Sequence, residues 1–343
     1  MSLPRPRLPR SRAGRLVLLV LALAAAVALI LWRLDVHVIT DAFALVTWKW
    51  VVVAIALNLV SVLVRSVAWK IVIDQAVPPP RPRRRTVFSA FSIGLLGNAA
   101  LPGRAGELAR VIVLDRRLPH RPGTWATLMG TVFTHRLFDV VVASVLVVFV
   151  IYAARIPDWA RPTLAIALGI GIGLLLAALI VARRTPRGGL EGLGPVRRLL
   201  GMARRGLTVL KRPAPAFAAL SFQVVGWGAQ LLAVWAMLRA FEIDSPIEAA
   251  ALVLVIMNLV MVFPLWPGNV GLVQAAVALS LLTYGVGYGR GFAFGIGVHA
   301  VELGVGISLG LLFLAREGFS IAVLRRMPDL REAVPDETVE RVA

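Results

Sequence analysis

The chain of 343 residues contains no cysteine, which excludes disulfide bonds, thiolate metal ligands and a cysteine nucleophile. Charged residues make up only 16% of it, well below the roughly 25% of an ordinary soluble domain. Acidic residues are the scarcer sign, with 18 Asp and Glu against 37 Lys and Arg. No ATP-binding motif and no phosphatase or transferase signature stands out. The low share of charged residues fits the composition of a chain that is not an ordinary soluble domain.

Apolar residues make up 59% of the chain, and several runs reach the ~20 residues that a helix needs to cross a bilayer. The arginines cluster between those runs, which favours membrane topology and contact with anionic lipid over binding of nucleic acid. We therefore predict an all-α polytopic membrane protein with about six full spans. The predicted spans are roughly 16–32, 48–72, 124–151, 162–182, 217–241 and 291–315.

Two further apolar stretches, 87–114 and 247–283, are interrupted by proline and glycine. Proline removes a backbone hydrogen bond and glycine loosens a helix, so neither stretch forms one smooth helix. Irregular backbone at membrane depth must be buried in protein or line a wet cavity. We predict that each stretch is a re-entrant hairpin of two short helices.

Basic residues set the expected orientation. They lie before residue 16 and in 81–85, 115–122 and 183–216, whereas 242–246 is acidic. By the positive-inside rule both termini are cytoplasmic in the inner (plasma) membrane, and the two hairpins enter from opposite faces. The basic N-terminus and first apolar run also have features of a signal peptide. The run is long for one, so we expect an uncleaved span.

The two breaks share a spacing of proline and glycine. The matching residues, 165 positions apart, are Pro102 and Pro267, Gly103 and Gly268, and Gly106 and Gly271. Each break lies between two predicted spans, and the two units so formed have opposite orientations. This pattern is typical of inverted repeats whose broken helices form a transporter's binding site. A coincidence between two Pro-Gly breaks in a glycine-rich chain is the alternative.

These features divide the chain into five parts. The parts are 1–47 (basic N-terminus and first span), 48–151 (first repeat unit with hairpin 87–114), 152–216 (a span and a basic cytoplasmic loop), 217–315 (second unit with hairpin 247–283) and 316–343 (polar cytoplasmic tail). Within the basic loop, apolar and arginine residues alternate at helical spacing, which predicts an interfacial helix on anionic headgroups.

Three charged residues follow the first break. Arg104 stands at the expected start of a half-helix, where free N–H groups and the helix dipole favour an anion. Glu107 is within reach of both Arg104 and Arg110, so a closed Arg-Glu-Arg lock is the alternative to a ligand site. One carboxylate cannot neutralise two guanidinium groups, which favours a bound anion such as a phosphate.

Other polar residues lie inside the spans and near the breaks. A buried His–carboxylate pair at helical spacing either relays protons or only fixes helix packing. The candidate substrate-binding residues are Arg104, Glu107, Arg110, Asn98, Asn269, Gln274 and Arg136. The candidate coupling residues are His135, Asp139, His299 and Glu302. We predict neither a metal site nor a cofactor.

These motifs resemble the transmembrane region of lysylphosphatidylglycerol synthases, a family also described as flippase-like integral membrane proteins. The resemblance covers about 16–315. The residues that carry it are Pro102, Arg104, Gly106, Glu107 and Arg110, then Arg136 and Asp139, then Pro267, Gly268 and Gly271. The chain departs from the family pattern at Gln274, where a glutamate is usual, and at His135, where an acidic residue is usual.

The resemblance implies movement of an anionic lipid between leaflets, either a phospholipid or a polyprenyl-phosphate-linked glycan. It does not imply lysyl transfer, and we expect no enzymatic activity. An accessory subunit of a membrane glycosyltransferase or lipid synthase is one alternative. A membrane-embedded enzyme acting on lipid headgroups, with His135 or His299 as base, is the other. The expected partners are an anionic lipid, such a synthase or glycosyltransferase, and further copies of the chain, but no nucleic acid.

Overall fold

The computed structural model describes most of the chain from Val36 to Arg316. The described residues are 36–100, 105–119, 123–183, 209–210, 212–262, 265 and 267–316. The first predicted span, 16–32, lies outside them, as do nearly all of the predicted interfacial helix and the tail after residue 316.

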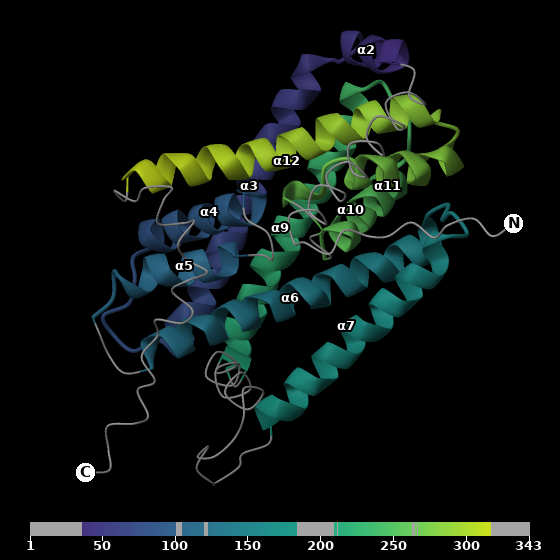
Figure 1. Ribbon diagram of the computed structural model, residues 1–343. Coiled ribbons are helices and arrows are strands. Elements are labelled where there is room, and N and C mark those ends of the chain that lie inside the picture. The colour runs from purple at the N-terminus through teal and green to yellow at the C-terminus, as the bar shows by residue number, and fades with distance from the viewer. Residues whose placement is uncertain are drawn as a thin grey trace, which may run out of the picture.

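The described part of the chain is helical and contains no strand (Figure 1). Its helices are α2 (Val36–Ala44), α3 (Trp48–Ala76), α4 (Arg84–Ala100), α5 (Gly106–Asp115), α6 (Thr124–Ala153), α7 (Ala160–Arg183), α9 (Pro213–Ala240), α10 (Ile247–Val262), α11 (Leu272–Leu281) and α12 (Tyr288–Arg316), with short 3₁₀ turns η3 (Pro267–Asn269) and η4 (Leu282–Tyr284). Five of them, α3, α6, α7, α9 and α12, are long and apolar enough to cross a membrane. They coincide with the five predicted spans that lie within the described residues, so the prediction of an all-α polytopic protein is confirmed.

Large apolar side chains cover the outside of these long helices. Val52 of α3 is 64% exposed, and Val145 of α6 and Ile170 of α7 are exposed as well. A soluble protein does not leave so many large apolar side chains in water, whereas lipid tails are as apolar as these side chains are. The exposed surface of the spanning helices is therefore suited to the bilayer interior.

Helix α2 was not expected, because the segment between the first two predicted spans reads as a near-neutral loop. Val36–Ala44 is helical, and α2 packs on the start of α12. Ala42 is buried, and the ring of Phe43 meets the ring of Phe241 edge-on, with 5.3 Å between centroids. The apolar side chains of α2 thus pack against the rest of the protein. The helix was not predicted because these side chains do not form a long apolar run.

Each interrupted stretch folds as two helices that contact one another. Helix α4 packs on α5 in the first, and α10 packs on α11 in the second. In the first pair the backbones meet: a Cβ on Gly106 would lie 1.9 Å from the carbonyl oxygen of Gly94 and 2.6 Å from the amide nitrogen of Asn98. In the second pair Gly268 and Gly271 have φ of 68° and 92°, which only glycine adopts without strain.

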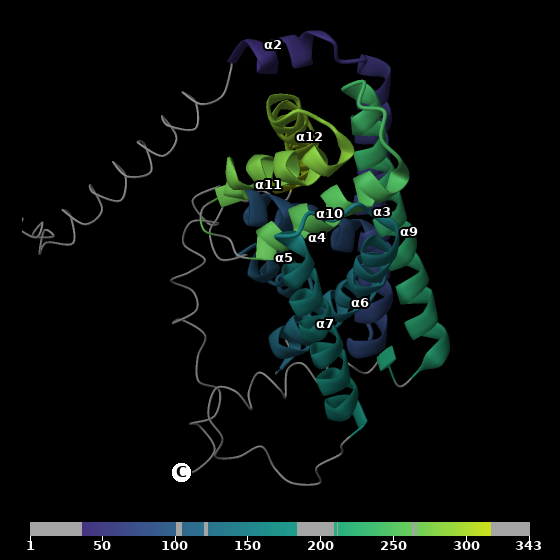
Figure 2. The same cartoon turned by 90° about the vertical axis from the view of Figure 1, so that its right-hand side faces the viewer.

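Helices α3 and α9 form the most extensive helix–helix contact and lie side by side in Figure 2. They are antiparallel, because the amide of Thr47 at the start of α3 bonds to the carbonyl of Ala240 at the end of α9 (2.8 Å). At the other end, the guanidinium of Arg212 donates to the side-chain oxygen of Gln75 (3.1 Å). Thr47 and Arg212 are 165 positions apart, and so are Gln75 and Ala240. The contact at one end of the helix pair therefore corresponds to the contact at the other end when the two repeat units are exchanged.

The same spacing relates the residues at the crossing point. The hydroxyl of Ser61 donates to the carbonyl of Gly226, 165 positions later, at 2.7 Å. Both residues lie at the middle of their helices. In the two units α3 corresponds to α9, α4 to α10 and α6 to α12. The contact of α4 with α12 is matched by that of α10 with α6, and the contact of α3 with α6 is matched by that of α9 with α12. The helices therefore pack with an approximate two-fold relation that passes between Ser61 and Gly226.

Replacing Gly106 by alanine should destabilise the protein, because the added methyl group collides with the backbone of α4 rather than with a movable side chain. Overpacking of this kind costs about 1–3 kcal/mol. The measurement is the thermal unfolding midpoint in detergent. The matched control is Gly304→Ala in α12, where the methyl group meets nothing within 4 Å. An equal effect of the two substitutions would contradict the close helix contact.

Candidate functional site

The charged residues of α5 and α6 meet beside the first break. Glu107, in the first turn of α5, accepts hydrogen bonds from Arg110 one turn later and from Arg136 of α6. The Nε of Arg136 lies 2.8 Å from the Glu107 carboxylate. Glu107 therefore joins a residue of its own short helix to a spanning helix.

Asp139 is the centre of the network. Arg136 donates to one of its carboxylate oxygens at 3.0 Å. The other oxygen accepts from Arg65 of α3 (2.7 Å), from Trp227 of α9 (3.0 Å) and from the amide of Gln223. Four donors from three helices thus surround a carboxylate at the middle of α6. A buried charge is stable in such a place only when its partners satisfy it in this way.

Arg110 and Arg136 differ in their surroundings. Arg110 is 3% exposed, and its guanidinium lies over the ring of Trp69, 4.7 Å from the centroid, with Phe91 beside it. Its Nε has no hydrogen-bond partner within the described part of the chain. The side chain of Arg136 is 38% exposed. Arg136 is thus the accessible cation of the network, and Arg110 is enclosed by aromatic rings.

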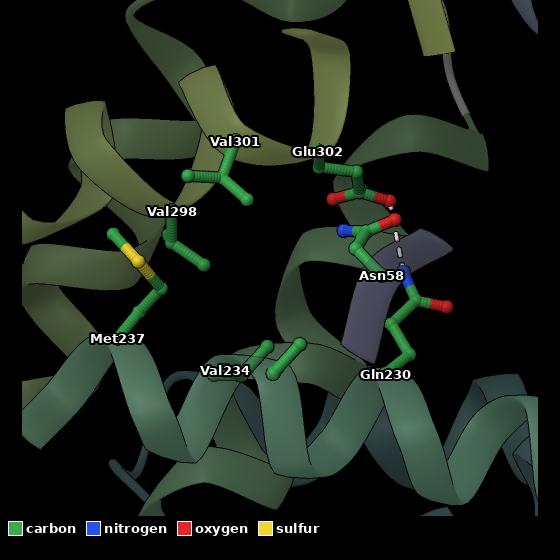
Figure 3. A pocket seen from close by; sticks show the side chains of 8 residues that line it. Asn58, Gln230, Val234, Met237, Val298, Val301 and Glu302 are labelled. Atoms are coloured by element: carbon green, nitrogen blue, oxygen red, sulfur yellow. Dashed lines mark hydrogen bonds between the residues drawn. The ribbon is translucent and has the colours of Figure 1, made fainter. Parts of the chain in front are cut away.

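The network continues across the α3–α9 crossing. Arg65 also donates to the side-chain oxygen of Gln230 (3.2 Å), and the Gln230 amide donates to Glu302 of α12 (2.9 Å). Arg65 and Gln230 are themselves 165 positions apart. A continuous chain of polar contacts therefore runs from Glu107 through Asp139 to Glu302, at the middle of the last span. Figure 3 shows its far end, where Gln230 meets Glu302.

The two buried histidines sit in different environments. The Nε2 of His135 donates to the carbonyl of Arg65 (3.2 Å), while its Nδ1 lies 3.8 Å from Asp139. The amide of Gly271 donates to the oxygen of Gln274 (2.6 Å), which leaves the Gln274 nitrogen to donate to Nδ1 of His299 (3.1 Å). His299 therefore carries its proton on Nε2, which has no partner among the described residues.

The remaining predicted site residues belong to the breaks. Asn269 is buried and ties the second break together, accepting from the amide of Leu265 (3.0 Å) and donating to the carbonyl of Val260 (2.9 Å). Asn98 lies against Gly106, and its side-chain oxygen has no partner among the residues that the structure describes. Pro102, Gly103 and Arg104 lie outside the described residues, and for Pro267 only the backbone is described.

The predicted residues thus form two groups rather than one. Glu107, Arg110, Arg136, His135 and Asp139 meet in the first, and Gln274 and His299 meet in the second. Glu302 joins the first group through Gln230, a residue that the sequence did not single out.

Arg65, Gln223, Trp227 and Trp69 are further members of the first group that sequence reasoning missed. Arg65 had a signal, since an arginine within an apolar span is expected to be functional or paired. The matching position of Gln230 in the second repeat unit was a second signal.

The buried acids and histidines differ in whether they could accept a proton. Both oxygens of Asp139 and Nδ1 of His299 accept hydrogen bonds, whereas Nδ1 of His135 has no hydrogen-bond partner among the described residues. Within the described residues no three His, Asp or Glu side chains gather in a way that could hold a metal ion. What the network offers is fixed positive charge at the middle of a span.

Apolar spanning helices around a buried charged network define an integral multi-pass membrane protein. The chain belongs to the family described as the lysylphosphatidylglycerol synthase TM region, which it matches over residues 15–310. The resemblance noted from the sequence motifs is therefore confirmed. No curated protein and no solved structure matches the chain.

Replacing Asp139 by asparagine should strongly destabilise the protein, because Arg65 and Arg136 lose their common counter-charge. Breaking a buried ion pair costs about 3–5 kcal/mol. The measurement is the unfolding midpoint in detergent, together with the yield of monodisperse protein. Asp158→Asn is the control, because Asp158 is 97% exposed and pairs only loosely with Arg161. A change no larger than that of the control would show that Asp139 is not the centre of the network.

Proposed function

We propose that the protein moves an anionic lipid with a phosphate headgroup, a phospholipid or a polyprenyl-phosphate-linked lipid, between the leaflets of the membrane. The single observation that carries the proposal is the excess of arginine in the network around Asp139. Arg65, Arg110 and Arg136 meet two carboxylates there, those of Glu107 and Asp139. One positive charge remains among these five side chains, because the third carboxylate of the chain of polar contacts, Glu302, is reached only through the neutral Gln230.

The position of the network supports translocation rather than surface binding. Asp139 and Arg136 lie near the middle of α6, about 20 Å from either end of the helix at 1.5 Å per residue. A lipid crossing the membrane needs a partner for its phosphate at this depth. Its tails stay in the bilayer, in contact with the apolar side chains that face outward.

Arg136 is the residue that we assign to the headgroup. It is the most exposed arginine of the network, and a planar guanidinium matches the oxygens of a phosphate. Arg110, enclosed by Trp69 and Phe91, would hold Glu107 in place instead. Arg104, which lies outside the described residues, stays a candidate headgroup residue on the sequence alone.

We also propose the inner membrane as the location, with both termini in the cytoplasm, on the distribution of basic loops. Transport is favoured over catalysis because Asp139 and Nδ1 of His299, two of the groups considered for base catalysis, already accept hydrogen bonds. A glycosyltransferase or lipid synthase remains a proposed partner that would supply or consume the lipid. In the accessory-subunit alternative, the arginine network would be a structural lock and the partner would act on the lipid.

The test is native mass spectrometry of lipids that co-purify with the protein. Wild type should retain an anionic lipid, and Arg136→Gln should retain at least about tenfold less, since one charge-assisted contact contributes about 1.5–3 kcal/mol. Arg104→Ala should act in the same direction. Arg161→Gln is the matched control, because Arg161 is 68% exposed and remote from the network.

A second assay measures translocation directly. Wild type in phosphatidylcholine vesicles should move fluorescently labelled phosphatidylglycerol or a labelled polyprenyl phosphate between leaflets, and Arg136→Gln should not. Unfolding midpoints establish that the variants are folded. Identical lipid profiles for folded wild type and variants would identify the network as an internal lock and favour the accessory subunit.

A further inference from the structure

Glu302 stands beside a small cavity at the middle of the molecule. Asn58 and Gln230 line it on the polar side, and Figure 3 shows both side chains turned toward the Glu302 carboxylate. The apolar side is formed by Ala233, Val234, Met237, Val298 and Val301. The cavity has a volume of about 10 Å³, enough for a single water molecule.

Glu302 is the counterpart of Asp139 in the packing of the two repeat units. Each is a carboxylate at the middle of the last helix of its unit, α12 or α6. Asp139 is approached by Arg65 of α3 and Gln223 of α9. At the spacing of 165, Arg65 corresponds to Gln230 and Gln223 corresponds to Asn58. Gln230 and Asn58 are the polar residues beside Glu302. The two carboxylates therefore occupy matching positions with different partners.

The difference lies in charge. Asp139 has two arginines within hydrogen-bonding distance, whereas Glu302 has a neutral amide from Gln230 and, among the described residues, no ion pair. A carboxylate at this depth without a cation requires either a neighbouring positive charge or a proton. Because position 230 holds glutamine where position 65 holds arginine, no described arginine contacts Glu302 directly, and a proton is the way left to neutralise it on the spot.

Among the described residues, Arg65 of α3 is the charged side chain that acts on Glu302, and it does so through space because its guanidinium contacts Gln230 rather than the carboxylate. Helix α9 contributes the neutral Gln230. Helix α11 has no titratable residue, and the arginines of α4 are at its far end. On α12 itself, His299 is one turn away and is held by Gln274. Glu302 is therefore the group beside the cavity that we expect to take up a proton.

The connected network has a simple charge balance. It contains three arginines and three carboxylates: Arg65, Arg110 and Arg136, with Glu107, Asp139 and Glu302. With Glu302 ionised the described network is neutral. With Glu302 protonated it carries one positive charge, which a singly charged phosphodiester balances.

We propose that Glu302 takes up one proton whenever the network binds an anionic headgroup, so that lipid and proton cross the membrane together. This inference rests on the proposed function and names its energy source. The proton adds to the Glu302 oxygen that Gln230 does not contact, converting carboxylate to carboxylic acid. Release of the lipid and return of the proton to water restore the carboxylate. Gln230 and Arg65 connect this event to Asp139.

The experiment uses the full chain in phosphatidylcholine vesicles with a trace of fluorescent phosphatidylglycerol, with the membrane potential held at zero. When the interior is one pH unit more alkaline, wild type should shift the labelled lipid toward the inner leaflet by up to about tenfold. Glu302→Gln, an uncharged mimic of the protonated acid, should still exchange lipid but leave the ratio near one. Glu242→Gln, at an exposed position, should behave as wild type.

A second measurement follows the proton itself. The infrared difference spectrum between acidic and alkaline buffer should contain a carboxylic acid band in wild type that is lost in Glu302→Gln and grows when phosphatidylglycerol is added. This readout requires no transport.

The outcomes separate the two proposals. If wild type exchanges lipid but its lipid distribution does not respond to the pH gradient, proton coupling is overturned and the lipid-transport proposal stands. A carboxylic acid band that is unchanged in Glu302→Gln has the same meaning. Wild type that exchanges no lipid under any gradient contradicts both. A Glu302 band in such a protein would leave only a proton-binding site without transport.

Discussion

The antiparallel crossing of α3 and α9 is the contact on which the rest of the structure depends. Ser61 and Gly226 meet there, and glycine is required because a methyl group at 226 would lie 2.5 Å from Cγ of Arg65. This close approach puts Arg65 between the two halves, where it reaches both Asp139 and Gln230. Separating the helices would break the polar chain at its centre and leave charged groups in hydrocarbon without partners.

The two broken helices both expose backbone and polar groups that need partners inside the membrane, and they satisfy them in different ways. In the first, Gly106 lets α5 lie directly on the backbone of α4, and the charged residues that follow are paired with α6. In the second, the polar groups are neutral: Asn269 satisfies freed backbone groups, and Gln274 links the turn to His299. One break thus carries charge and the other, in its described residues, carries only hydrogen bonds, which makes the two breaks chemically unequal.

Much of the fold was predictable, because apolar runs of sufficient length and Pro-Gly breaks are properties of the sequence itself. Helix α2 was missed since its apolar residues form no long run. At the site, the pairing of Glu107 with Arg110 and of Arg136 with Asp139 followed from helical spacing. The contacts of Arg65 and Gln230 did not, because they connect helices 165 residues apart, and spacing within one helix says nothing about the neighbour that packs on it.

The different residues at positions 65 and 230 have a consequence for how such a fold can arise. If the two halves were separate, identical chains paired about the axis between Ser61 and Gly226, the same side chain would stand on both sides. Two arginines would repel one another there, and two glutamines would leave both acids without a cation. Because both halves lie in one chain, positions 65 and 230 can carry different side chains. The protein thus holds one acid in contact with arginines and one in contact with an amide.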